Sequence, residues 1–171
     1  MTPGSVTAVS GTDLVADARR MAGYHAVESA LFVVTGRWIQ RYDGPSLRTR
    51  IAVWNHHHAE HAARWAARYP TIEELPPIDA AVPATSVAAI EAVTDLGSLA
   101  SSVLPQLADA YRDFAELVDP RLDGPTARIL DRVRTDIEAQ VAEMQAIAVS
   151  TGSAGTAPTP AVTTALADLL P

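Results

Sequence analysis

The chain has 171 residues, of which 48% are hydrophobic, enough for one sizeable core and too few for two comfortable domains. It contains neither cysteine nor lysine, which excludes thiol nucleophiles, cysteine-ligated metals and lysine Schiff bases. A net charge of −7 without an arginine cluster argues against nucleic acid as a partner. Neither a signal peptide nor a membrane-spanning run is recognisable, so a cytoplasmic protein is expected.

The first predicted helix follows a short N-terminal stretch, residues 1–11, which is rich in Gly, Ser and Thr and expected to be flexible. The helix is predicted over residues 12–40, where apolar residues such as Phe32 recur at alternating spacings of three and four. His25 and Glu28 occupy two steps of this stripe. Both side chains are therefore expected to point into the protein.

The second predicted helix, residues 47–68, carries four of the five histidines, and the fifth is His25. Its stripe reads Leu47, Ile51, Trp54, His58, His61 and Trp65. Two histidines thus replace apolar residues on a face that is otherwise expected to be buried. His56 and His57 lie off this face, because a helix cannot bring three consecutive side chains to one side, and they are expected to face solvent or a subunit interface.

The remainder of the chain is predicted to be helical as well, with no segment that reads as a strand. A proline-rich connection is expected at 69–83, a short helix at 86–99, a third long helix from 101 or 102, and a fourth after Pro125, ending near residue 149. Residues 150–171 would form a Gly, Thr and Pro rich spacer and a short apolar segment. We expect that segment to dock on the helices or on a second copy of the chain.

The sequence predicts an all-α antiparallel four-helix bundle over residues 12–149, with one long crossover between its second and third helices. Four segments carry a resemblance to a known family: Tyr24 to Glu28, Trp54 to Trp65, Val103 to Tyr111, and Gly124 to Leu130. In these segments the chain resembles small ferritin-like proteins of actinobacterial type. The resemblance implies a small-molecule enzyme or binding protein of bacterial specialised metabolism. The apolar C-terminal segment and the moderate size of the chain are compatible with a homodimer.

Ferritin-like carboxylate proteins hold two metal ions with a Glu on each of two helices and Glu-x-x-His on each of the others. This chain departs from that set. Glu28 fits, but the second helix offers His58-x-x-His61, with Glu60 about 100° off the stripe. The third helix supplies no inward carboxylate, and the fourth offers Ile137-x-x-Gln140. The sequence therefore argues against a dinuclear centre.

Two kinds of chemical function remain open for the inward-facing residues: a metal site and a metal-free acid-base site. A mononuclear Fe or Mn site would use Glu28, His58 and His61, a two-His, one-carboxylate set, with Glu60 as a further possible ligand. The reading that the sequence favours is metal-free: the catalytic group would be Glu28, His58, His61 and His25, acting as acid and base on a small organic substrate.

In the metal-free reading, a polar and aromatic wall would bind the substrate. Its predicted members are Tyr24, Trp54, Trp65, Tyr111 and Gln140. The third alternative is non-catalytic: a buried His-Glu layer that fixes the register of the helices. The sequence names neither the substrate nor the reaction.

Overall fold

The computed structural model describes residues 14–151 and 159–170, and within them every regular element is helical and none is a strand. The predicted flexible N-terminus and most of the predicted spacer lie outside the described residues. None of the described helices combines the length and the apolar character needed to cross a bilayer. The expectation of an all-α fold is confirmed.

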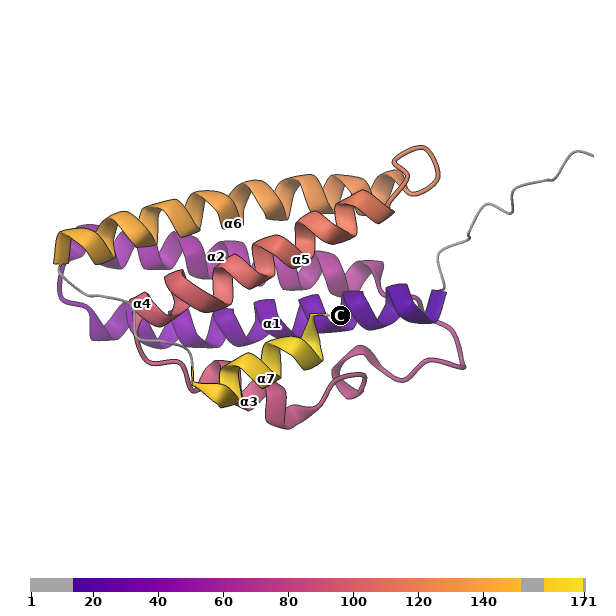
Figure 1. Ribbon diagram of the computed structural model, residues 1–171, viewed down its shortest axis with the longest axis horizontal. Coiled ribbons are helices and arrows are strands. Elements are labelled where there is room, and N and C mark those ends of the chain that lie inside the picture. The colour runs from indigo at the N-terminus through magenta and orange to yellow at the C-terminus, as the bar shows by residue number, and fades with distance from the viewer. Residues whose placement is uncertain (1–13, 152–158, 171) are drawn as a thin grey trace, which may run out of the picture.

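Four long helices lie side by side, as Figure 1 shows. The first two are joined by a short turn at 42–44, and the last two by a turn at 118–123, so each pair is antiparallel. The long connection between the pairs leaves α2 and α5 running in the same direction (Figure 1). The four helices are α1 (Leu14–Arg41), α2 (Pro45–Arg68), α5 (Leu104–Leu117) and α6 (Gly124–Thr151).

The core lies where these helices meet: α1 packs on α2, α5 on α6, and α2 on α6. Its largest fully buried side chains include Trp65, Tyr24 and Tyr111. The predicted stripe of α1 is only partly right, since Phe32 is 44% exposed whereas Leu31 and Val34 are buried. Besides α2, α1 also contacts α3 (Ala84–Glu91) and α7 (Pro160–Leu169), which widens the buried face of the helix beyond the predicted stripe.

The connection between the two pairs contains several short elements in place of the one helix predicted at 86–99. That helix ends early because Asp95 caps a new turn, its Oδ1 accepting from the backbone N–H of Ser98 at 2.7 Å. A π-helical segment then leads directly into α5. The elements are η1 (Ile78–Ala80), α3 (Ala84–Glu91), α4 (Leu96–Ser98) and the π-helix η2 (Leu99–Val103).

The C-terminal apolar segment forms α7 (Pro160–Leu169), which packs on α3 and α1 of the same chain. Figure 1 shows it beside α3, below α1. Its buried residues are Val162, Ala165, Leu166 and Leu169. The sequence left open whether this segment docks on the helices of its own chain or on a second copy. In the structure it docks on the helices of its own chain.

Gly23 allows the close approach of α7 to α1. A Cβ at this position would lie 1.8 Å from the backbone oxygen of Leu169. We expect Gly23→Ala to lower the free energy of unfolding by about 2 kcal/mol, because the backbone of α7 must move away. Urea denaturation measures this change.

Gly36→Ala is the matched control for Gly23→Ala, since both glycines lie within α1. Its Cβ would meet only the amide nitrogen of Asn55, at 3.3 Å. Alanine there should be neutral, or stabilising by up to about 1 kcal/mol through helix propensity. Equal effects of the two substitutions would contradict the close-packing argument.

Candidate functional site

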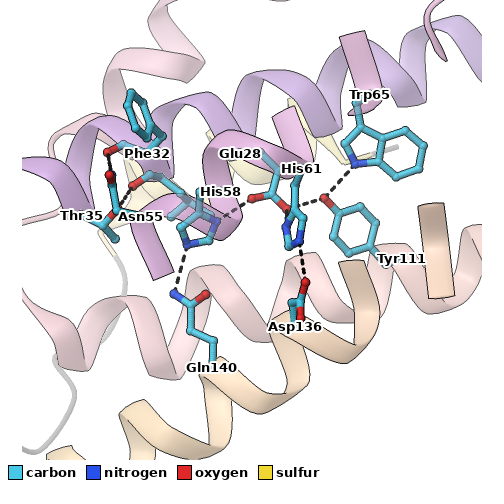
Figure 2. Close-up of polar contacts among 11 residues, drawn as sticks. Glu28, Phe32, Thr35, Asn55, His58, His61, Trp65, Tyr111, Asp136 and Gln140 are labelled. Atoms are coloured by element: carbon cyan, nitrogen blue, oxygen red, sulfur yellow. Dashed lines mark hydrogen bonds and ion pairs between the residues drawn. The ribbon is translucent and has the colours of Figure 1, made fainter. Parts of the chain in front are cut away.

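Glu28 from α1 meets His58 and His61 from α2 in the middle of the molecule (Figure 2). Glu28 Oε2 lies 2.6 Å from His58 Nδ1, and Glu28 Oε1 lies 3.1 Å from His61 Nδ1. All three side chains are 0% exposed. The helical spacing of His58 and His61 places both rings on one face, so one carboxylate bridges them.

Residues from α6 hold the far side of each imidazole ring (Figure 2). His61 Nε2 lies 3.1 Å from Asp136 Oδ2, and Gln140 Nε2 donates to His58 Nε2 at 3.0 Å. Arg132 also pairs with Asp136, its Nε 2.8 Å from Oδ2. Both histidines are therefore fixed from two sides, and both turn Nδ1 toward Glu28.

Tyr111 from α5 completes the cluster, donating its hydroxyl hydrogen to Glu28 Oε1 at 2.6 Å. The indole N–H of Trp65 in turn donates to the Tyr111 oxygen at 3.2 Å. The Tyr24 ring packs against both, with ring centroids 5.1 Å from Trp65 and 4.7 Å from Tyr111. An aromatic layer thus closes one end of the polar cluster.

The charges of the cluster favour an ionised Glu28. Burial alone would raise its pKa, but the charge of His58 and the hydrogen bonds from both histidines outweigh burial and lower the pKa from 4.5 to about 2. Burial alone would lower the pKa of His61, yet its hydrogen bonds and charge interactions with Glu28 and Asp136 raise it. The site therefore stabilises negative charge on Glu28 and positive charge at His61.

The structure separates His25 from the other predicted catalytic residues. Its Nδ1–H donates to the Ala62 carbonyl at 3.0 Å, and its Nε2 lies 3.2 Å from Asp79 on η1. The expectation that His25 joins Glu28 is wrong: the two positions lie only about 60° apart around α1, but hydrogen bonds to Ala62 of α2 and Asp79 of η1 hold the His25 ring instead. His25 instead lines a cavity of about 310 Å³ between α1 and α3.

Two further predicted residues lie away from the cluster. Trp54 is buried, but its indole N–H donates to Glu143 of α6 at 3.1 Å. Glu60 faces outward and pairs with Arg64 one turn later. The offset of about 100° that the sequence predicts between Glu60 and the stripe of His58 and His61 therefore excludes Glu60 as a further metal ligand.

His56 and His57 differ from each other. His56 is exposed, as predicted, whereas His57 is half-buried and stacks on His61 with ring centroids 6.2 Å apart. Within the described part of the chain, His57 Nδ1 has no hydrogen-bond partner. Burial lowers the pKa of His57, so this ring is expected to be neutral where it covers His61.

Asp136 is the residue of the cluster that sequence reasoning missed. The predicted inward stripe of the fourth helix includes Val133, Ile137 and Gln140, and Asp136 lies four residues before Gln140. A stripe of normal width includes the positions three and four apart, so Asp136 shares the face of Val133 and Gln140. Because its side chain is acidic, Asp136 does not stand out as an inward-facing residue in a stripe identified from apolar positions.

Comparisons of this chain with protein-family models, with curated proteins and with solved structures found no match. What the site can do must therefore be argued from its own atoms. One oxygen of Glu28 and one nitrogen each of His58 and His61 lie within 4.8 Å of one another. This combination of imidazole nitrogen and carboxylate oxygen suits iron, manganese and zinc.

Tyr111→Phe should lower the free energy of unfolding by about 2 kcal/mol. The change removes a hydrogen bond to an ionised carboxylate and leaves the Trp65 indole N–H without its acceptor. Tyr24→Phe is the control, since that hydroxyl makes a neutral bond to the Ala110 carbonyl. Urea denaturation measures the free energy of unfolding of both variants. Equal losses would show that the Tyr111 hydroxyl stabilises the fold no more than the Tyr24 hydroxyl does.

Proposed function

We propose that this chain is a ferritin-like helical protein that binds one divalent transition-metal ion through Glu28, His58 and His61. The observation that carries the proposal is the position of His61, whose two ring nitrogens each lie 3.1 Å from a carboxylate oxygen. A neutral imidazole has only one N–H. It cannot donate to both Glu28 and Asp136.

His61 is therefore doubly protonated, or one of the two carboxyl groups carries the second proton, or a cation lies between one nitrogen and its carboxylate. With the Nε2–H donated to Asp136, the lone pair of Nδ1 points toward Glu28. A metal ion at that place would replace the second proton. Carboxylate, histidine and metal in series is the usual arrangement by which a second carboxylate orients a metal-binding imidazole.

The partner of His58 supports the same proposal. As drawn in Figure 2, the Gln140 amide nitrogen donates to His58 Nε2, and the amide oxygen of Gln140 has no partner among the described residues. A metal ion at Nδ1 requires the proton of His58 to move to Nε2. Rotation of the Gln140 amide would then let Oε1 accept a hydrogen bond from the Nε2–H of His58, which gives the unpartnered oxygen a partner.

The donor set favours Fe(II) or Mn(II), because two histidines and one carboxylate leave coordination positions open. Such an ion supplies oxidation and reduction chemistry when bound. Since Glu28, His58 and His61 are wholly buried, only very small molecules could reach the ion without movement of the helices. The proposed class is therefore a mononuclear metal oxidoreductase acting on a small oxidant.

Helix order supports the ferritin-like assignment: two antiparallel pairs are joined by a long connection (Figure 1). The candidate ligands point between the helices (Figure 2). The ligand set supports one ion over two. Tyr111 occupies α5 where a second glutamate is expected, and Gln140 occupies α6 in place of the second histidine. A dinuclear centre would lack bridging carboxylates.

A metal-free acid-base site is the second candidate. It is favoured by the unbroken hydrogen-bond chain from Trp65 through Tyr111 to Glu28 and on to both histidines. Such a chain can move a proton between Tyr111 of α5 and the histidines of α2 through Glu28 of α1. Binding of an organic substrate would additionally require the helices to open, because Glu28 is not accessible at the surface.

Metal titration of protein purified without a histidine tag tests the proposal. After chelation and dialysis, Fe(II) under anaerobic conditions or Mn(II) should bind to about one ion per chain. His61→Gln and Glu28→Gln should lose this binding, whereas His56→Gln, an exposed control on the same helix, should retain it. Stoichiometry near two, or binding that follows His56 rather than His61, would refute the site.

A further inference from the structure

A cavity of about 390 Å³ lies away from the Glu28 cluster, where α3, α4, η2 and the start of α7 come together. Figure 1 shows α3 and α7 side by side with α4 near their end. Small apolar side chains line much of it, among them Ala92 and Val93 after α3 and Val162 of α7. Its size lies in the range of small-molecule sites, on the order of a dozen water volumes.

Ser102 is the unusual polar group of this lining. The residue is 4% exposed, and its hydroxyl has no hydrogen-bond partner in the part of the chain that the structure describes. The other polar groups beside it are engaged: Ser98 donates to Asp95 through both its hydroxyl, at 2.8 Å, and its backbone N–H. A buried hydroxyl without a partner is costly and calls for a bound group.

Ser102 differs from its neighbour Ser101, although both lie in the π-helical segment η2. A helical serine commonly donates to the carbonyl one turn earlier, as the neighbouring Ser101 does to Gly97 at 2.8 Å. Ser102 makes no such bond, and it lies in the wider turn of η2. π-helical turns inside α-helices are frequently found at functional sites.

We propose that this cavity binds a compact, neutral and largely apolar molecule whose single carbonyl or ether oxygen accepts a hydrogen bond from Ser102. The Asp95 carboxylate at the cavity disfavours anions, and the alanine and valine lining favours an apolar body. This inference is independent of the metal proposal, because no residue of the Glu28 cluster lines the cavity.

The neutral naphthyl ketone prodan is a suitable probe, since its emission moves to shorter wavelength in apolar surroundings. The full chain should bind it saturably, at about one probe per chain. Ser102→Ala should weaken binding about fivefold through loss of one hydrogen bond. Ala92→Trp should abolish binding, because residue 92 is exposed at the edge of the cavity and a large ring there fills it.

Two matched variants serve as controls. Ser101→Ala removes a hydroxyl that is satisfied within η2, and Ala88→Trp adds an indole on the exposed side of α3 that lines the other cavity, beside His25. Both should bind prodan as the unmodified chain does. Absent or unsaturable binding overturns the proposal, as does binding that survives Ala92→Trp, that Ser102→Ala leaves unchanged, or that Ala88→Trp removes.

Discussion

Glu28→Ala should destabilise the metal-free protein by about 4 kcal/mol, the largest loss that we expect from a single substitution in the cluster. Glu28 is wholly buried and takes part in three hydrogen bonds, with His58, His61 and Tyr111. Its removal leaves these groups buried without their shared acceptor. Urea denaturation in the presence of a chelator measures the change directly.

Glu60→Ala provides the matched control for that measurement. Glu60 is a glutamate on α2 next to His61, but its side chain is partly exposed and forms an ion pair with Arg64. An exposed helical ion pair of this kind contributes less than about 1 kcal/mol. If both alanine variants lose the same small amount, the buried cluster does not stabilise the fold in the way described above.

The stability of the metal-free protein should fall by about 3 kcal/mol more than that of Glu28→Gln as the pH decreases from 4.5 to 2. Folding lowers the pKa of Glu28 from 4.5 to about 2, so its contribution is fully present above 4.5 and disappears as the folded carboxylate becomes protonated. Other carboxyl groups titrate in both proteins. The difference between the two curves therefore isolates Glu28.

His61 should act at the other end of the pH range. Its pKa is raised by Glu28 and Asp136, which outweigh the opposite effect of burial. Its contribution is therefore present below its ordinary pKa of 6.5 and is lost as the pH rises through the raised value. Parallel curves for the unmodified protein and Glu28→Gln throughout the acid range would contradict the ionised-cluster account.

Helical periodicity was sufficient to predict the four long helices and three residues of the cluster. Glu28, His58 and His61 interrupt apolar stripes in long helices, where position in the sequence determines the face on which a side chain lies. Gln140 was found in the same way. The turns after α1 and α5 were marked by Asp-Gly-Pro and by Asp-Pro with Asp-Gly-Pro.

Other features depend on tertiary contacts that periodicity does not contain. His25 lies on the side of α1 covered by η1 and α3, so its partner is Asp79 from the crossover rather than Glu28. Asp136 is charged and is not among the apolar positions of the predicted stripe, although it contacts His61. The break after α3 follows from one local hydrogen bond, the Asp95 cap, which competes with helix continuation.

We expect one metal ion to bind between Glu28, His58 and His61, and anomalous diffraction from crystals equilibrated with Mn(II) tests this expectation. A single anomalous peak should lie in contact with both histidine Nδ1 atoms and a Glu28 oxygen, with the Gln140 amide rotated so that Oε1 faces His58 Nε2. A cluster that keeps its present hydrogen bonds and shows no peak there would contradict this expectation.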